Sequence, residues 1–325
     1  MKNYHKYILL TIVVAFAITS CNKSDPAAAT GTTTSTTTTL TGPGATWTAV
    51  AAPTGTSNWR GVAFGSNIWV AVGNGQRATS TDGNAWTSVA VTASGISFQN
   101  SIVFATGVFI IASQLGVSTS ANGTTWTSQS LSLAQNLVSV AYGNGIWLIA
   151  DDRFLSSDVL SFMVSSTNGA GWAQSITTIP YAQPTSIAFG NGQFVVVGYG
   201  GLVAKSTNGS GWVQQNLGST SDLGLLAVTF ANNQFVTVTN SGKAYRSTDG
   251  ATWTKSTVTV NGLYGVSYGN GVYVAVGAAG SIFTSPDAVT WTRRTWSGPS
   301  AAFEDVGFGN SRFVAAGDYS FAVSM

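Results

Sequence analysis

A hairpin-like unit recurs seven times along the chain, and this repetition limits the possible folds more than any other feature. The unit is clearest at 62–73 and 140–150, where two short runs of β-branched and aromatic residues flank a turn rich in Asn and Gly. Asn and Gly tolerate the positive φ angles of tight turns, so each unit predicts two antiparallel strands. Further copies begin at Ile102, Ile187, Val228, Val266 and Val306.

A second motif follows most of the hairpins. It first runs from Ser80 through Asp82 and Gly83 to Trp86. Later copies end at Trp126, Trp172, Trp212, Trp253 and Trp291, at intervals of 38 to 46 residues. A repeat of about 40 residues that holds four short strands is typical of one propeller blade. We therefore predict an all-β fold, a seven-bladed β-propeller of four-stranded antiparallel blades.

The two ends of the repeat region complement each other. The last hairpin is followed by Phe321–Met325, and the chain stops where the second motif would begin. The missing half is found at the other end, where 44–48 matches 250–254. We predict that a strand around Trp47 completes the C-terminal blade. Such closure hides an edge strand that would otherwise promote aggregation.

The first 43 residues do not share the repeat. Residues 1–21 have a basic start, an apolar run too short to span a bilayer, and Cys21 in a lipobox-like sequence. They predict a lipoprotein signal peptide, with an ordinary secretory signal as the alternative. Residues 22–43 are Thr-rich and predict a disordered tether before the propeller at 44–325. We expect an outer-membrane lipoprotein of the bacterial cell envelope, facing the periplasm or the surface, whose membrane contact is the lipid anchor alone.

Composition excludes several functions. Charged residues make up 7% of the chain, and without Lys2 and Lys6 the 11 basic residues equal the 11 acidic ones. Such a chain has no electrostatic footprint for nucleic acid. The only His and Cys are His5 and Cys21, both in the leader. This excludes His-dependent nucleophilic catalysis, His/Cys zinc sites and disulfides in the propeller. We expect no cofactor and a monomeric domain.

The second motif resembles the Asp-box (BNR) repeat, and the wider pattern is similar to photosystem II assembly-factor-like propellers. The resemblance covers 44–325 and implies the fold, but not one activity, because such propellers include sialidases, receptors and scaffolds. In this motif the Asp side chain caps a tight turn and the Trp packs against the blade. We therefore assign structural rather than catalytic roles to Asp82, Trp86, Trp126, Trp172, Trp212, Asp249, Trp253, Asp287 and Trp291; Asn replaces Asp at 122, 168 and 208.

Variable residues precede each hairpin, where one blade connects to the next. Variable polar and aromatic side chains around one mouth of the ring are typical of a recognition surface. The alternative is that they only cap the central channel. The candidate ligand-binding residues are Trp59, Arg60, Gln99, Asn100, Tyr264, Phe303 and Glu304. We predict a non-catalytic module that binds a protein or a glycan, and an assembly or scaffold role is an alternative by analogy.

Two further hypotheses concern acidic residues. A sialidase-like exo-glycosidase would need opposed carboxylates, whereas Glu304 and Asp305 are adjacent in a predicted strand and should point to opposite faces. The Phe/Tyr-Arg-Ile-Pro signature of sialidases is also absent. The longest repeat contains Asp151, Asp152 and Asp158, whose carboxylates could bind a hard cation such as Ca²⁺. A solvated loop without metal is the default interpretation of that insertion.

Overall fold

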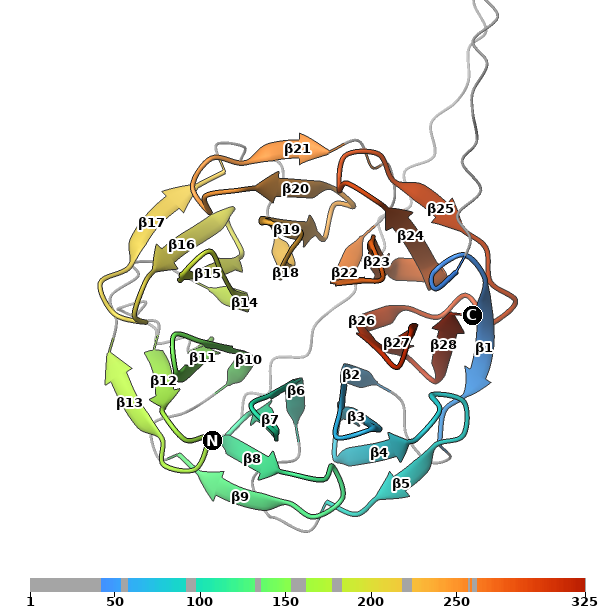
Figure 1. Ribbon diagram of the computed structural model, residues 1–325, viewed down its shortest axis with the longest axis horizontal. Coiled ribbons are helices and arrows are strands. Elements are labelled where there is room, and N and C mark those ends of the chain that lie inside the picture. Colours follow the sequence, from blue (N-terminus) through green and yellow to red (C-terminus); the bar gives the residue numbers. More distant parts are fainter. Residues whose placement is uncertain are drawn as a thin grey trace, which may run out of the picture. The chain divides into compact units, whose positions relative to one another are not determined.

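Seven four-stranded antiparallel sheets are arranged around a central axis in the computed structural model (Figure 1). The structure describes residues 42–53, 58–91, 98–131, 136–152, 162–176, 183–217, 224–256, 258 and 262–324. The predicted all-β, seven-bladed propeller is confirmed. Within the described ranges, no helix is long and apolar enough to cross a membrane.

Each blade is formed by four strands that are consecutive in the chain, except the last. Blade 1 comprises β2 (Trp59–Gly65), β3 (Ile68–Gly73), β4 (Gln76–Ser80) and β5 (Thr87–Val89). Blade 2 comprises β6 (Gln99–Ala105), β7 (Val108–Ser113), β8 (Gly116–Ser120) and β9 (Thr127–Ser130). Blade 3 comprises β10 (Leu137–Gly143), β11 (Ile146–Asp151), β12 (Phe162–Ser166) and β13 (Ala173–Ile176). Blade 4 comprises β14 (Pro184–Gly190), β15 (Gln193–Gly198), β16 (Leu202–Ser206) and β17 (Val213–Asn216).

The remaining blades follow the same order. Blade 5 comprises β18 (Leu225–Ala231), β19 (Gln234–Thr239), β20 (Ala244–Ser247) and β21 (Thr254–Ser256). Blade 6 comprises β22 (Leu263–Gly269), β23 (Val272–Gly277), a 3₁₀ turn η1 (Ala278–Gly280), β24 (Ser281–Ser285) and β25 (Thr292–Arg294). Blade 7 comprises β26 (Phe303–Gly309), β27 (Arg312–Gly317), β28 (Ser320–Ser324) and, from the other end of the repeat region, β1 (Trp47–Ala51).

The ring closes within blade 7. Strand β1 pairs antiparallel with β28, with Trp47 opposite Ser324 and Val50 opposite Phe321. The Trp47 indole Nε1 donates to the Gly44 carbonyl at 3.1 Å, as Trp86 Nε1 donates to Gly83 at 2.8 Å. The predicted pairing of the N-terminal strand with the C-terminal blade is confirmed.

The hydrophobic core is divided among the seven interfaces between neighbouring blades. The outermost-strand Trp of each blade packs against the preceding blade: Trp86 of blade 1 lies 4.6 Å from the Phe321 ring of blade 7, measured between ring centroids. In blade 7 this position is occupied by Trp47, which packs with residues of blade 6 such as Val274. The sequence predicted that each of these Trp residues packs against a blade, and in the structure the contact extends to the preceding blade, because the faces of a propeller sheet are covered by its neighbours.

The motif that contains Asp82 forms a turn between the third and fourth strands, which we call the outer turn. Asp82 Oδ1 accepts hydrogen bonds from the N–H groups of Asn84 at 2.8 Å and Ala85 at 3.0 Å, and Gly83 has a φ of 78°. The same two acceptor bonds occur where Asn122 replaces Asp. The capping bonds anticipated from the sequence are present, and they require an oxygen rather than a charge.

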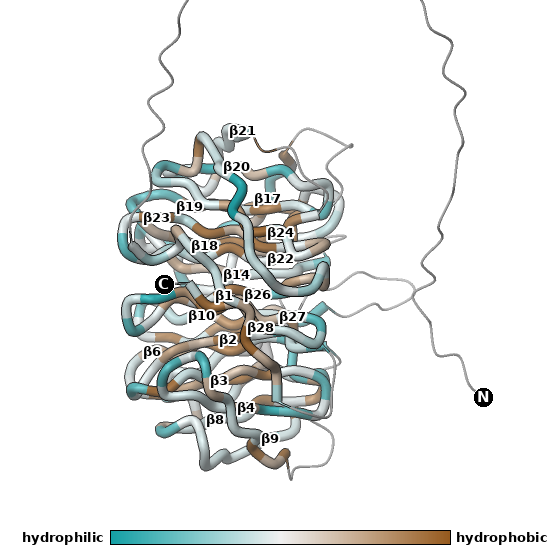
Figure 2. The backbone as a smooth tube through the Cα atoms, turned by 90° about the vertical axis from the view of Figure 1, so that its right-hand side faces the viewer, coloured by the Kyte–Doolittle hydropathy of each residue, from teal (hydrophilic) through white to brown (hydrophobic). Residues whose placement is uncertain are grey.

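The two ends of the ring carry different connections. Hairpin turns between the first and second strands lie beside the outer turns of the next blade: Ser66 Oγ donates to the Ala121 carbonyl at 2.9 Å, and Asn144 Nδ2 to the Thr207 carbonyl at 2.9 Å. We call this end the hairpin face. The opposite end, the inter-blade face, carries the connections between blades and the turns between second and third strands. Figure 2 shows hydrophobic segments through the middle of the blades and hydrophilic turns at the two ends.

Candidate recognition site on the inter-blade face

A β-bulge opens the first strand of every blade at the inter-blade face. The pairing register of the first two strands shifts by one residue there, for example between Phe303 and Asp305 and between Trp59 and Gly61. A bulge leaves one extra residue unpaired and changes where it points. The seven bulge residues, none of them fully buried, are Arg60, Asn100, Val138, Thr185, Leu226, Tyr264 and Glu304. Four of these were predicted as ligand-binding residues.

The residue before each bulge points into the core. Trp59, Gln99 and Phe303 are 1%, 0% and 0% exposed. Their side chains are not available on the surface, so these three predicted contacts leave the candidate site. The physical reason is the bulge, because it separates two neighbouring residues that sequence reasoning treated as one surface pair.

Four polar side chains from three consecutive blades interact at the mouth of the ring, and we call them the polar cluster: Arg60, Tyr264, Glu304 and Asp318. Burial raises the pKa of the Glu304 carboxyl, and the negative charge of Asp318 raises it further, whereas the positive charge of Arg60 opposes both. Burial also raises the pKa of the Tyr264 phenol, with added contributions from Glu304 and Asp318. Arg60 itself is exposed.

Asp318 was missed by the sequence analysis. It lies in the turn between β27 and β28, and its N–H donates to the Ala302 carbonyl at 2.9 Å. Its Oδ1 atom is buried and has no hydrogen-bond partner among the described residues. A buried carboxylate oxygen without a donor is costly. The only sequence signal was a polar residue that follows the second strand, as Asn74, Asp152 and Asn240 do in other blades.

Asn100 belongs to a different part of the same ring. Its Nδ2 donates to Asn136 Oδ1 at 3.0 Å and to the Leu137 carbonyl at 2.8 Å. Thr185 bridges blades 4 and 5 in the same way, since its Oγ1 donates to the Leu225 carbonyl at 2.5 Å. These bulge residues bridge blades, so Asn100 contributes to the wall of the mouth and not to the polar cluster.

Asp305 follows Glu304 but is held differently. Its Oδ2 accepts the Val62 N–H at 2.9 Å and its Oδ1 accepts the Val306 N–H at 2.8 Å. Burial raises the pKa of this carboxyl to about 6, although both hydrogen bonds oppose the shift. A carboxylate occupied by two backbone donors is poorly placed for attack on a substrate. The structure therefore gives Glu304 and Asp305 separate environments.

Most of the large exposed apolar side chains lie on the inter-blade face. Within the described part of the chain, six large hydrophobic residues are exposed, and four of them lie at this end: Phe98, Leu115, Tyr199 and Tyr319. Tyr319 is 72% exposed and follows Asp318 of the polar cluster. Aromatic side chains with few rotatable bonds are common anchors in binding surfaces.

The acidic insertion of blade 3 does not form a described metal site. Asp151 is buried at the end of β11, and its Oδ1 accepts the Asn136 N–H at 2.9 Å. Burial and the neighbouring charge of Asp151 raise the pKa of Asp152 to about 6. Asp158, like Cys21, lies outside the described residues, among which no group of three or more acidic, His or Cys side chains could bind a metal. The cation hypothesis stays a prediction.

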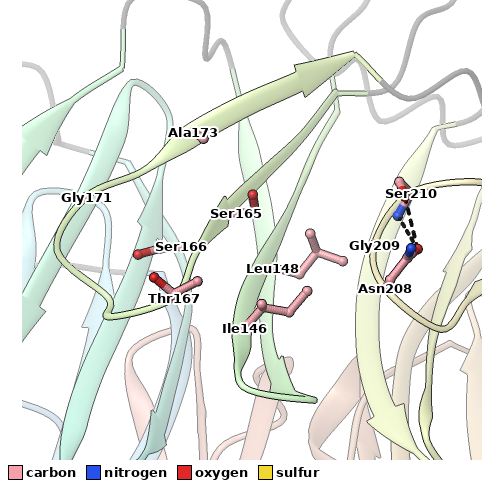
Figure 3. Close-up of a pocket in the computed structure, with 10 residues that line it drawn as sticks. All are labelled: Ile146, Leu148, Ser165, Ser166, Thr167, Gly171, Ala173, Asn208, Gly209 and Ser210. Atoms are coloured by element: carbon pink, nitrogen blue, oxygen red, sulfur yellow. Dashed lines mark hydrogen bonds between the residues drawn. The ribbon is translucent and has the colours of Figure 1, made fainter.

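A separate groove of about 340 Å³ lies between blades 3 and 4 (Figure 3). Ile146 and Leu148 form its apolar wall, and the outer turn of blade 4 lies on the other side, where Asn208 Oδ1 accepts the Ser210 N–H at 3.0 Å. None of its lining residues is charged. This groove has the hydroxyls and backbone of a structural turn, and it lacks the titratable groups that the polar cluster has.

Comparisons with known proteins agree with the propeller fold. The DUF6242 beta propeller domain family matches residues 187–303. No curated protein matches the sequence. The structure of a streptogramin B lyase is similar, with a TM-score of 0.75 and 10% sequence identity over 86% of this chain and 97% of the lyase.

Two other similar structures are not described as enzymes. YCF48 bound to a D1 peptide has a TM-score of 0.66 and 17% identity over 86% of this chain and 94% of its own. The extracellular domain of the putative one-component system BT4673 from B. thetaiotaomicron has a TM-score of 0.68 and 11% identity over 86% of this chain and 40% of its own. The structural neighbours of this propeller thus include an enzyme and a peptide-binding protein, and identities this low show the fold alone.

Proposed function

We propose that this protein is a non-catalytic propeller that binds a protein or a glycan through its inter-blade face. The observation that carries the proposal is the coincidence of the polar cluster with Phe98, Leu115, Tyr199 and Tyr319 on one end of the ring. Aromatic anchors bury much area at low entropic cost, and charged neighbours fix orientation. This composition favours a protein segment over a neutral sugar. The peptide bound to the similar YCF48 propeller is consistent with such a use.

The polar cluster adds chemical selectivity to the proposed surface. The charges of Asp318 and Arg60 both act on the Glu304 carboxyl, with opposite effects, and Asp318 Oδ1 has no donor among the described residues. A partner that supplies a Lys, Arg or hydroxyl donor would satisfy that oxygen. We therefore expect a hydrogen-bond donor of the partner to sit between Glu304 and Asp318.

The cellular location is part of the same proposal. The leader at 1–21 and the Thr-rich segment at 22–43 support attachment through a lipid on Cys21 and display of the propeller on the bacterial outer membrane. The Ser80–Trp86 motif supports assignment of the outer turn to the Asp-box type, with one departure: the interval from Asp82 to Trp86 is one residue shorter than in the sialidase box. Labelling with a radioactive fatty acid tests the anchor, and Cys21→Ala should abolish the label. A label that persists in Cys21→Ala would refute the lipidation.

Binding can be tested with substitutions matched for exposure and apolar character. Full-length protein would be cross-linked to its partners in detergent-solubilised envelope. A separate sample of the purified protein would be applied to a glycan array. The double variant Phe98→Ser with Tyr319→Ser should lose the captured partner. Val213→Ser with Val289→Ser removes exposed apolar side chains elsewhere, at 55% and 38% exposure, and should retain it. Equal capture by both double variants would contradict binding through the inter-blade face.

A sialidase-like activity is the enzymatic alternative, and the raised pKa of Glu304 is the observation that favours it. A panel of fluorogenic glycosides distinguishes the two functions. We expect no turnover. Turnover that disappears in Glu304→Gln, while thermal unfolding stays unchanged, would establish the glycosidase and overturn the non-catalytic proposal. A lyase of the streptogramin type is not supported, because a His→Ala variant of the similar virginiamycin B lyase is described as inactive and this propeller has no His.

A further inference from the structure

A single position on the third strands distinguishes blade 1 from the others. Arg77 in β4 pairs with Val72 in β3, close to the turn that joins these two strands. The residues at the equivalent register in blades 2 to 7 are Val117, Met163, Val203, Ala244, Ile282 and Phe321. All six are apolar, as a side chain between two packed sheets should be. Arg77 is nevertheless only 3% exposed.

Arg77 is held by neutral groups. Its Nε donates to Gln99 Oε1 at 2.5 Å and its Nη2 to Ser118 Oγ at 2.8 Å, while its guanidinium lies 4.5 Å from the ring centre of Trp126. Gln99 is itself fixed, since its Nε2 donates to the Gln76 carbonyl at 3.2 Å. Burial lowers the pKa of Arg77 to about 10, so the group keeps its charge at neutral pH. Among the described residues it has no carboxylate partner.

The equivalent interface between blades 7 and 1 shows how these positions are filled when they serve packing alone. There Phe321 replaces Arg77, Trp59 replaces Gln99 and Trp86 replaces Trp126. The rings of Phe321 and Trp59 lie 5.2 Å apart, and those of Phe321 and Trp86 lie 4.6 Å apart. An aromatic stack therefore suffices for stability at this position. A buried cation there is expensive unless something pairs with it.

Arg77 opens onto a groove between blades 1 and 2. The groove has a volume of about 520 Å³, and its walls include Trp126 and the hydroxyl residues Thr124, Thr125 and Ser128. The Nη1 nitrogen of Arg77 makes no hydrogen bond to any described residue. A guanidinium presents its donors in a planar fork that matches a carboxylate. The groove thus combines a pre-positioned carboxylate receptor with several hydroxyl groups.

We propose that the groove between blades 1 and 2 binds a sugar that carries a carboxylate, with Arg77 pairing the carboxylate and the hydroxyl residues contacting the ring. The carboxylate supplies the counter-charge that the protein does not provide. Thr124, Thr125 and Ser128 can exchange hydrogen bonds with sugar hydroxyls, which favours an acidic sugar over the carboxylate end of a peptide. Gln99 is a positioning residue, since it orients the guanidinium from inside the core. None of the residues of this groove belongs to the polar cluster or to the exposed apolar side chains on which the proposed function rests.

Titration of the ¹⁵N-labelled full-length protein with sodium glucuronate tests the site by the shift of the Trp126 indole N–H signal, assigned with Trp126→Phe. We expect a saturable shift with glucuronate and none with glucose. The variant Arg77→Val with Gln99→Leu reproduces the pair that Val117 of blade 2 and Leu137 of blade 3 form at the next interface, where both lie in one hydrophobic cluster, so it should fold. It should bind glucuronate at least about tenfold more weakly, a loss of about 1.4 kcal/mol.

A second pair of probes separates the sugar from other carboxylates. Acetyl-diglycine carries a free carboxylate, whereas acetyl-diglycine amide, the same peptide with an amidated C-terminus, does not. Equal or tighter binding of acetyl-diglycine than of glucuronate would overturn the assignment to an acidic sugar. No shift with glucuronate at concentrations up to about 50 mM, or equal shifts in the double variant with native-like thermal unfolding, would overturn the site itself.

Discussion

Asp305 Oδ2 accepts the Val62 N–H at 2.9 Å and so links the innermost strands of the last and first blades, 243 residues apart in the chain. In blades 3 and 4 an uncharged hydroxyl oxygen accepts the equivalent bond from the next blade: Ser139 Oγ accepts the Ile187 N–H at 3.2 Å, and Ser186 Oγ accepts the Val228 N–H at 3.1 Å. The carboxylate of Asp305 thus makes the same contact between blades that the hydroxyls of Ser139 and Ser186 make without a charge.

The charge of Asp305 makes the stability depend on pH. Burial raises the pKa of Asp305 to about 6 in the folded protein, above the value of about 3.9 in an unfolded chain. Because the folded state then binds the proton more tightly, the free energy of unfolding should fall as pH rises from about 4 to about 6 and level off above. Asp305→Ser keeps an acceptor without charge, so it should raise the free energy of unfolding at pH 7 by about 1–2 kcal/mol and flatten this dependence. Urea unfolding at several pH values measures both effects.

Two comparisons isolate the origin of that effect. Asp305→Ala removes the acceptor as well as the charge and leaves the Val62 N–H unpaired, so it should be less stable than Asp305→Ser. Asp152→Asn controls for the other carboxyl whose pKa is raised to about 6. The same pH slope in Asp305→Ser as in the natural protein would assign the effect to another group.

The outer turn of blade 1 should depend more on the Asp82 oxygen than on its charge. Asp82→Ala removes the acceptor of the Asn84 and Ala85 N–H groups, and we expect a loss of about 1 kcal/mol in the free energy of unfolding at pH 7. Asp82→Asn should be nearly neutral at pH 7, as the Asn122 turn indicates. Denaturant titration compares the two variants.

Acid should lower the free energy of unfolding of the natural protein more than that of the Asp82→Asn variant. The backbone N–H groups of Ala85 and Asn84 lower the pKa of Asp82 to about 2, so its ionised form stabilises the fold above pH about 4 and loses this effect as pH falls toward 2. Asp82→Asn lacks this titration. A natural protein and an Asp82→Asn variant that lose stability in parallel below pH 4 would contradict the capping role of the carboxylate.

The glycine of an outer turn is required for packing as well as for its backbone angle. Gly123 has a φ of 75°, and a Cβ there would lie 2.7 Å from Val70 Cγ2 of the preceding blade. Gly145, in a hairpin turn, has a φ of 77° but no atom within 4 Å of a Cβ. Gly145→Ala should therefore cost about 1 kcal/mol from the backbone alone, and Gly123→Ala clearly more. Equal melting temperatures for the two variants would refute the contact between blades.

Closure of the ring predicts a large effect of a short deletion. Removal of residues 44–51 takes away β1 and leaves β28 as an unpaired edge. Trp47 is 5% exposed, and burial of a Trp of this kind is worth about 3–5 kcal/mol. We expect a sharply lower melting temperature and concentration-dependent aggregation. Trp47→Phe, which retains β1, serves as the matched variant, and an unchanged melt of the deletion would contradict the closure.

The local chemistry of the chain was enough to predict the sheet architecture. Asn-Gly turns, alternation of apolar residues and the outer turn at Asp82 are properties of short segments, and short segments determine hairpins and capped turns. The match between the segment at Trp47 and that at Trp253 also revealed the closure, because equivalent sequences occupy equivalent strands. The prediction failed where a bulge intervened: Trp59 and Phe303 are buried although their neighbours Arg60 and Glu304 are not.

Repetition along the chain therefore determined the strands, their order and the number of blades, since each repeat carries its own turns and apolar pattern. Only the tertiary structure decided which side chains meet between blades. It brought Glu304 to Asp318 and Arg60, joined Asp305 to Val62, and placed Arg77 over Trp126. Those contacts depend on the twist and packing of adjacent sheets, and no periodicity within one repeat specifies them.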